Sequence, residues 1–361
     1  MEITSTYLRF LLILALVECH DIYDPETCGL PGAAFAKPRI KRDPLAIEDD
    51  SEYYPHYADD YVLNDNVTDV LHDPNDPMEK MVMGGEKVSL GELPWSARLE
   101  MSHGGRMVIC GGTLVTRRHL ITAAHCFWNN PGTDGCSIKD MLPIKYVRKN
   151  GMATVGAICR AESSSAKCTG EEAGTKLRIK NAFYERFFKE GCTGSSDFAV
   201  VELERDVPKG IYHVCLPHMH NVDDLDLRTA KLFSSGWGIN PLKGYTDNPS
   251  PTLQKIDLGM MLTDEECMTE DVQTVQDIFC TAEYSEKNLC IGDSGSGVTF
   301  SLNGRYYLAG VVSRGSNCLG LIQGVKPVGQ THLNLAYHTA DIDTLLGMRI
   351  EDRRAEWKNT N

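Results

Sequence analysis

Hydrophobic and polar positions follow two different patterns along the 361-residue chain. After Met81, short runs rich in β-branched and aromatic residues are separated by Gly, Pro and Asn, as at 106–115, 198–203 and 306–313. Such runs are typical of the strands of an all-β barrel or sandwich. Residues 338–348 instead place apolar side chains on one face of a helix. The pattern predicts an all-β domain that ends in a helix.

The stretch from residue 20 to residue 80 lacks these runs. It is rich in Asp, Pro, Tyr and Asn, and its 15 acidic and 5 basic residues give a charge of −10, most of the −14 of the whole chain. This composition predicts an extended, solvated segment without a core. The basic cluster Arg39–Arg42 is either a cleavage site for a furin-like convertase or a plain turn. Asn66 begins an Asn-Val-Thr acceptor for N-glycosylation.

Residues 1–19 have the dimensions of a signal peptide. The apolar run at 10–17 follows Arg9 and is too short to span a bilayer, although a short buried helix would give the same pattern. Removal of Cys19 with this peptide leaves twelve of the 13 cysteines, an even number that suits disulfides in an oxidising compartment. We therefore expect a secreted, extracellular protein without a membrane span.

Composition also bears on the partners of the protein. An apolar fraction of 42% with a negative net charge indicates a globular, soluble molecule and gives no basis for a nucleic-acid partner. No Cys-x-x-Cys or His-x-x-x-His pair supports a zinc site. No metal and no organic cofactor are expected.

Three separated motifs carry the residue types of nucleophilic catalysis. His125 lies between Thr-Ala-Ala and a cysteine, Asp197 enters an apolar run, and Ser294 follows Gly-Asp and precedes a glycine. Alone, each has an ordinary structural explanation, as a core histidine, a strand-edge acid or a loop hydroxyl. Together they meet the needs of a serine nucleophile, because its hydroxyl requires a base and the base requires a buried acid to fix its tautomer.

These motifs, in this order, resemble the trypsin-like serine proteases, and the likeness runs from about Val82 to the C-terminal helix. The resemblance implies two packed six-stranded Greek-key β-barrels with a C-terminal helix, preceded by an extended pro-segment. It implies that His125, Asp197 and Ser294 form the catalytic triad. It also implies that the backbone N–H groups of Gly292 and Ser294 form the oxyanion hole.

The same resemblance implies a zymogen with a pro-segment over residues 20–81 and a protease domain over 82–361. The freed amine of Val82 would then pair with Asp293 beside the nucleophile. Met81 precedes that bond, whereas a tryptic cut after Lys80 leaves one extra residue. The activating protease accepts Met81, or Met81 is trimmed, or the amine reaches Asp293 from one residue further out. The sequence leaves these three alternatives open.

Eight cysteines have partners by resemblance. The implied pairs are Cys110–Cys126, Cys267–Cys280, Cys290–Cys318 and Cys28–Cys215, the last of which would tether the pro-segment after cleavage. The other four cysteines lie in a long stretch between the histidine and aspartate motifs, at Cys136, Cys159, Cys168 and Cys192. Four cysteines allow three pairings, which stay open. This insertion either binds a partner or decorates the surface.

The resemblance places Asn288 at the base of the primary substrate pocket, where trypsin has an aspartate. No acid occurs between Val312 and His332 to replace it from the opposite wall, so we expect a specificity other than Arg or Lys. Ser313 and Gly315 match the segment that pairs with the substrate backbone as an added strand. Their neighbours depart from the family pattern, since Arg314 stands for a tryptophan and Ser296-Gly297 for Gly-Pro.

The sequence therefore predicts a secreted serine endopeptidase, made as a zymogen, that hydrolyses peptide bonds through an acyl-enzyme. Its expected partners are protein or peptide substrates, an activating protease and protein inhibitors. The alternative is a catalytically silent homologue that acts as a binding or regulatory module.

Overall fold

The computed structural model describes residues 23–31, 83–103, 106–129, 136–160, 168, 170–192, 196–222, 225–243, 250–267 and 276–347. The expected signal peptide (1–19), the basic cluster (39–42), Asn66, Met81 and Val82 lie outside these residues.

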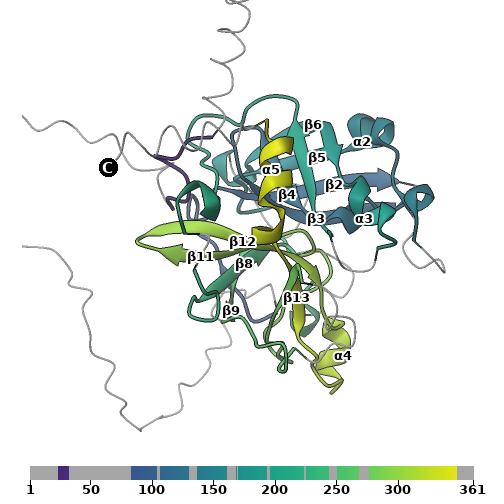
Figure 1. Ribbon diagram of the computed structural model, residues 1–361, viewed down its shortest axis with the longest axis vertical. Helices are drawn as coiled ribbons and strands as arrows, with labels where there is room; N and C mark the ends of the chain where they lie inside the picture. The colour runs from purple at the N-terminus through teal and green to yellow at the C-terminus, as the bar shows by residue number, and fades with distance from the viewer. Residues whose placement is uncertain are drawn as a thin grey trace, which may run out of the picture. The chain divides into compact units, whose positions relative to one another are not determined.

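The first half of the strand-rich region forms a closed barrel (Figure 1). Its six antiparallel strands follow the order β2 (Ser96–His103), β3 (Arg106–Leu114), β4 (His119–Thr122), β7 (Ala199–Leu203), β6 (Thr175–Phe183) and β5 (Met152–Val155), which returns to β2. Buried and exposed side chains alternate along β6. Leu177 and Ile179 are buried, while Lys176, Arg178 and Lys180 face solvent. Closure leaves no unpaired sheet edge.

The second half forms a seven-stranded antiparallel sheet. Its order is β1 (Glu86–Lys87), β9 (Gln254–Gly259), β8 (Leu232–Gly236), β11 (Gly297–Leu302), β12 (Arg305–Arg314), β13 (Gln330–Asn334) and β10 (Ile278–Thr281). The hairpin between β11 and β12 turns at Asn303-Gly304. Both residues have a positive φ (51° and 76°), as a two-residue type I′ turn requires. The two-residue β1 makes this sheet one strand larger than the six that we expected.

The predicted β architecture is confirmed, and β3, β7 and β12 occupy the three runs from which strands are predicted. The helices are short: α2 (Ile144–Asn150), α3 (Glu185–Lys189), α4 (Cys318–Ile322) and α5 (Thr339–Leu345), with 3-10 turns η2 (Ala124–Phe127), η3 (Ile138–Asp140), η4 (Gly170–Ala173), η5 (Pro217–Met219), η6 (Pro241–Lys243) and η7 (Leu335–His338).

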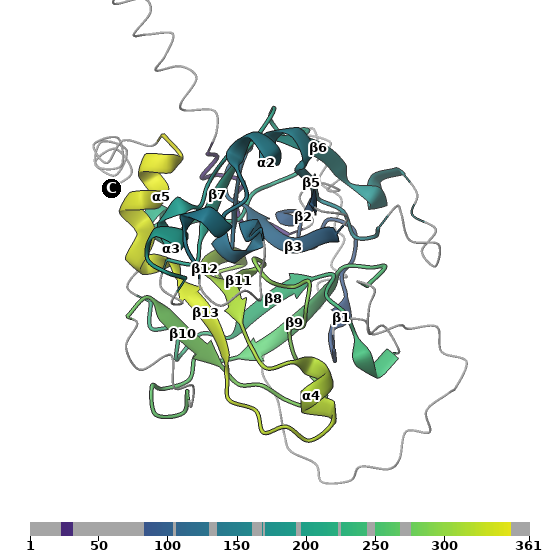
Figure 2. The same cartoon turned by 90° about the vertical axis from the view of Figure 1, so that its right-hand side faces the viewer.

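The C-terminal helix is confirmed with different bounds. It begins as η7 and continues as α5, and Gly347 with φ 72° follows the last turn. Ile342 and Leu346 are buried, whereas Ala340 is exposed. An ion pair of 2.7 Å between Asp341 and Arg186 joins α5 to α3 of the first half, and the two helices are neighbours in Figure 2. The C-terminal helix therefore contacts α3, which lies in the first half of the domain.

The barrel and the sheet contact each other at β3 and β11. The loop that carries Ser294 lies at this junction. The N–H of Gly111 donates to the carbonyl oxygen of Ser294 at 2.7 Å. Gly295 has φ 83°, and a Cβ there would come within 2.6 Å of the carbonyl oxygen of Gly111. Only glycine satisfies both constraints, because an L side chain is disfavoured at this φ and would also clash.

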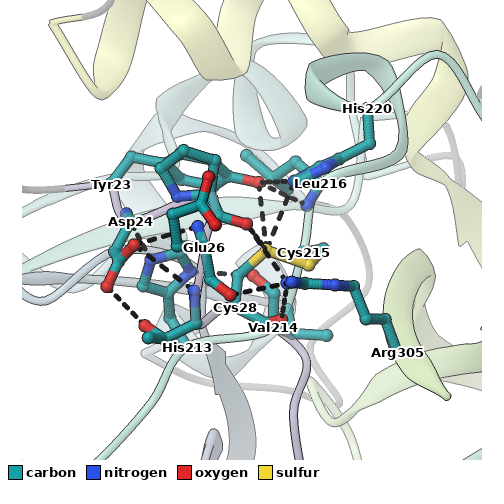
Figure 3. The surroundings of a disulfide bond; sticks show 12 residues. Tyr23, Asp24, Glu26, Cys28, His213, Val214, Cys215, Leu216, His220 and Arg305 are labelled. Carbon is teal, nitrogen blue, oxygen red and sulfur yellow. Dashed lines mark hydrogen bonds between the residues drawn. A yellow bond between two sulfur atoms is a disulfide. The ribbon is translucent and has the colours of Figure 1, made fainter.

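Residues 23–31 lie against the loop that carries Cys215 and against the start of β12 (Figure 3). Besides the Cys28–Cys215 disulfide, the Gly29 N–H donates to the carbonyl oxygen of His213, and the Gly29 carbonyl oxygen accepts from the Tyr306 N–H. The Arg305 guanidinium donates to three carbonyl oxygens of the segment, those of Pro25, Glu26 and Cys28, at 2.8 to 3.1 Å. Non-covalent contacts therefore hold this segment in place together with the disulfide.

Two histidines serve this segment as hydrogen-bond acceptors. His213 Nδ1 donates to the carbonyl oxygen of Val214 and Nε2 accepts the Asp24 N–H, each at 2.9 Å, so the imidazole must be neutral. His220 Nε2 lies 2.9 Å from the Tyr23 hydroxyl. Burial lowers the pKa of both histidines to about 4, helped at His220 by the charge of Arg305.

We expect acid to loosen residues 23–31. Both histidines have a lowered pKa when residues 23–31 are docked. Their contribution to the stability of docking is therefore complete above the ordinary pKa of ~6.5 and is lost as the pH falls toward 4. Hydrogen exchange at pH 7 and pH 5, corrected for intrinsic rates, should show protection falling about tenfold per pH unit for each histidine. Strand β6 is the internal control, and a His213→Gln variant should show a weaker pH dependence. Equal changes in the segment and in β6 would contradict this expectation.

Candidate active site

His125 and Asp197 are brought together by the pairing of β4 with β7. Thr122, at the end of β4, is the register partner of Ala199, at the start of β7, so the residues just beyond these ends meet. Asp197 accepts from His125 twice: Oδ2 lies 2.7 Å from Nδ1 and Oδ1 lies 2.8 Å from the backbone N. The carboxylate is fully buried, while the imidazole is 24% exposed. Nδ1 therefore carries the proton, and Nε2 is left as a base.

Further groups fix Asp197, and sequence reasoning missed most of them. The Ser313 hydroxyl donates to Oδ2 at 2.5 Å. Ser196 has φ 58°, and its N–H donates to Asp277 Oδ2 at 2.9 Å. That same oxygen lies 2.8 Å from Nε2 of His338. The buried Asp277–His338 pair thus holds the strained backbone in front of Asp197.

Ser294 lies in the loop that precedes β11, half-buried and on the lining of a surface cavity. The loop is fixed beside the histidine motif, because the Ser294 carbonyl oxygen accepts from Gly111 and lies 3.9 Å from the sulfur of Cys126. Among the described residues, the Ser294 hydroxyl makes no hydrogen bond. The N–H groups of Gly292 and Ser294 also have no acceptor within that part of the chain.

Asp293 is a fully buried carboxylate whose described partners are all neutral. Oδ1 accepts the Gly238 N–H at 2.7 Å and Oδ2 accepts the Cys290 N–H at 2.9 Å. Burial raises the pKa of Asp293 to about 6, against the lowering effect of these two bonds. Gly292 has φ 99°, which favours glycine in this turn. The residues that the structure describes supply no cation to this acid.

Met83 is the first described residue after the expected cleavage site. It is fully buried against Cys290, Cys318 and Leu321, and its carbonyl oxygen accepts the Asn288 N–H at 2.9 Å. The chain next to Val82 is therefore anchored to the wall that also carries the serine loop.

Ser313, Gly315 and Gln330 line the same surface cavity as Ser294. Asn288 is the residue that the resemblance places at the base of the primary pocket. It is 2% exposed, does not line this cavity, and its Nδ2 lies 3.3 Å from Oε1 of Glu283. The buried Asn288 amide therefore donates a hydrogen bond to the buried carboxylate of Glu283.

Twelve cysteines form six disulfides: Cys28–Cys215, Cys110–Cys126, Cys136–Cys192, Cys159–Cys168, Cys267–Cys280 and Cys290–Cys318. Within the described residues, two groups of cysteine and histidine are close enough to share an ion, around His125 and around His220. Their cysteines are oxidised to disulfides and so offer no thiolate to a metal.

The Trypsin family model matches residues 82–328. The chain is 33% identical over 266 residues to "Trypsin-like protease try-5" of Caenorhabditis elegans, covering 68% of this chain and 80% of that protein. It is 29% identical to "Proclotting enzyme" of Tachypleus tridentatus (66% and 60% covered) and 27% identical to "Phenoloxidase-activating factor 3" of Holotrichia diomphalia (66% and 66% covered). None of the helices that the structure describes is long and apolar enough to cross a membrane.

Asp293 should make the uncleaved chain less stable as the pH rises. Its pKa is raised in the folded state, so its contribution is complete below the ordinary value of 3.8 and is lost as the pH passes about 6. We expect the free energy of unfolding to fall by about 2–3 kcal/mol between pH 4 and pH 7.5 relative to an Asp293→Asn chain. Urea unfolding measures this difference, and Ser294→Ala in both chains removes the nucleophile. A pH-independent effect of the substitution on stability cancels when the two pH values are compared. If the stability difference between the two chains does not change with pH, the expectation is wrong.

Proposed function

The chain belongs to the trypsin family of serine proteases, and we propose that it is a secreted endopeptidase, made as a zymogen, with His125, Asp197 and Ser294 as its triad. The observation that carries this proposal is the double hydrogen bond from His125 to the buried carboxylate of Asp197. That arrangement leaves Nε2 free to take a proton. Ser294, the proposed nucleophile, lines a surface cavity.

The proposed reaction proceeds through an acyl-enzyme. Ser294 attacks the scissile carbonyl carbon, His125 takes the hydroxyl proton and gives it to the leaving amine, and Asp197 stabilises the imidazolium that forms. The unpartnered N–H groups of Gly292 and Ser294 stabilise the negative charge on the carbonyl oxygen. Loss of one such donor typically raises the barrier by about 2.7–4 kcal/mol. Water, deprotonated in turn by His125, then attacks the acyl-enzyme carbonyl, and the protonated His125 returns the proton to the departing Ser294 oxygen as the acid product is released.

The zymogen part of the proposal rests on Asp293. A buried carboxylate without a cation is costly, and an amine freed at Val82 would supply the missing charge. The anchored position of Met83 supports this, because Val82 is its neighbour in the chain. We propose a signal peptide over 1–19, a pro-segment over 20–81 that Cys28–Cys215 tethers, and a protease domain from 82. The three alternatives for the bond cut beside Met81 remain.

Secretion is supported by the six disulfides, since such bonds persist in oxidising compartments. The names of two relatives, a proclotting enzyme and a phenoloxidase-activating factor, favour protein substrates and a place in a sequence of proteolytic steps. An activating protease and protein inhibitors are the further proposed partners, and Asn66 is the proposed glycosylation site.

A fluorophosphonate probe tests the function directly. We expect it to label the cleaved protein at Ser294, and to label the uncleaved protein at least tenfold more slowly because Asp293 lacks its cation there. Mass spectrometry locates the label, and Ser294→Ala is the control. A cleaved, folded protein that fails to react at Ser294 would instead be the catalytically silent binding module.

Ser313→Ala should weaken catalysis by loosening Asp197. A hydrogen bond to a charged group contributes about 1.5–3 kcal/mol, so we expect kcat to fall at least tenfold while KM stays nearly constant. Cleavage of the best peptide from a substrate library measures both constants. Ser301→Ala is the matched control, because Ser301 is exposed on β11 of the same sheet. A kcat that equals that of the control would remove Ser313 from the site.

A further inference from the structure

A second acid–imidazole pair holds the residue in front of Asp197. Asp277, in the turn before β10, and His338, the last residue of η7, are 7% and 3% exposed. Because a carboxylate only accepts, Nε2 of His338 donates to Asp277 Oδ2, at 2.8 Å. The same oxygen accepts the Ser196 N–H at 2.9 Å. One carboxylate oxygen therefore joins the C-terminal part of the chain to the residue before the proposed triad acid.

The imidazole of His338 also packs on the residue after Asp197. Its ring centroid lies 4.7 Å from that of Phe198, with 40° between the ring planes. The Phe198 N–H donates to the Ser196 carbonyl oxygen at 2.7 Å, which closes a three-residue γ-turn centred on Asp197. His338 therefore acts on both ends of this 196–198 turn, through Asp277 at one end and through ring packing at the other.

The 196–198 turn needs this support because Ser196 has an unfavourable backbone conformation. Its φ of 58° lies in the left-handed region that residues other than glycine rarely adopt. Ser196 is 1% exposed, so its N–H requires an acceptor within the protein, which Asp277 supplies. Asp277 is fixed in turn, since its carbonyl oxygen accepts the N–H of Asn334, the last residue of β13, at 2.7 Å. Contacts with the second sheet therefore hold the turn.

The direction of the 196–198 turn determines what the side chain of Asp197 can reach. Its carboxylate meets two donors of His125 at once, Nδ1 at 2.7 Å and the backbone N at 2.8 Å. Only two side-chain torsions separate this carboxylate from the backbone, so a tilt of the turn displaces both contacts together. A misplacement of about 1 Å in a catalytic group can cost roughly a hundredfold in rate.

We propose that Asp277 and His338 are positioning residues for the proposed reaction. They fix the 196–198 turn from both ends and so keep the Asp197 carboxylate in line with His125. They act through the backbone around Asp197 and not on the substrate. The proposal rests on the proposed function, because it takes Asp197 and His125 as the acid and the base of the reaction.

Kinetics of the cleaved enzyme test this role. Asp277→Ala removes the acceptor of the Ser196 N–H, and we expect kcat to fall at least about tenfold while KM stays nearly constant, because only the base is displaced. His338→Phe keeps a ring against Phe198 but removes the N–H donor, so kcat should fall about fivefold. His338→Gln keeps an N–H donor and should stay within about twofold of the wild type. Titration of active sites with the fluorophosphonate corrects for unfolded enzyme.

His218→Phe is the matched control for His338→Phe. His218 and Asp343 form a buried pair of the same kind, 2.9 Å apart, that joins η5 to α5. We expect the loss of that pair to leave kcat nearly unchanged. Equal losses of kcat in His338→Phe and His218→Phe would overturn the proposal, and so would a His338→Gln enzyme as slow as His338→Phe. If Asp277→Ala does not fold, the His338 variants carry the kinetic test.

A proton resonance tests the geometry without catalysis. The strong hydrogen bond from His125 Nδ1 to Asp197 should give a low-field proton signal, which its loss in His125→Gln assigns. In cleaved Ser294→Ala protein we expect this signal to shift or broaden when Asp277→Ala or His338→Phe is added, and to stay in place in the control. An unmoved signal in both variants would refute the positioning role while the protease proposal stands. A wild-type enzyme that hydrolyses no peptide would refute the protease proposal, and the signal would still decide the positioning role.

Discussion

The buried carboxylate of Asp197 is the contact on which the candidate site depends. It is withdrawn from water and accepts hydrogen bonds from the His125 imidazole, the His125 backbone and the Ser313 hydroxyl. These donors come from the barrel and from the second sheet, so the two halves must pack correctly before the acid is satisfied. The stability of their junction and the geometry of the proposed base are therefore one requirement, because an unsatisfied buried carboxylate is costly.

Three buried acids, Asp197, Asp293 and Glu283, differ in the charge of the groups that donate to them. Asp197 faces an imidazole that can become positive, whereas Asp293 and Glu283 have only neutral donors among the described residues. For Asp293, the proposed missing charge is the amine freed at Val82. Backbone N–H groups from loops that follow or connect the strands, those of Gly238, Cys290, Ser316 and Val328, hold the two acids in place.

The sequence predicts the fold and the His125–Asp197 contact well because each depends on local patterns. Runs of β-branched residues specify strands, and the two motifs flank strands β4 and β7, which are neighbours. The contact of Asp277 with Ser196 is different, since the two residues are 81 positions apart and neither belongs to a periodic pattern. The contacts of Glu283 could not be predicted from the sequence for the same reason, because only folding brings its loop to Ser316 and Val328. The pairing of the four insertion cysteines likewise depends on loop geometry that spacing does not encode.

Arg314 shows how one departure from the family pattern changes its surroundings. Its guanidinium donates to the carbonyl oxygen of Cys192, and Cys192 is bonded to Cys136, so the insertion is fastened to the cavity wall. A tryptophan would offer an aromatic face and a single donor, and could not hold the insertion with a charge-assisted bond. Arg314 also lies between Ser313, which holds Asp197, and Gly315, which borders Glu283. The insertion, the proposed base and the cavity therefore meet at three consecutive residues, the last two of β12 and Gly315.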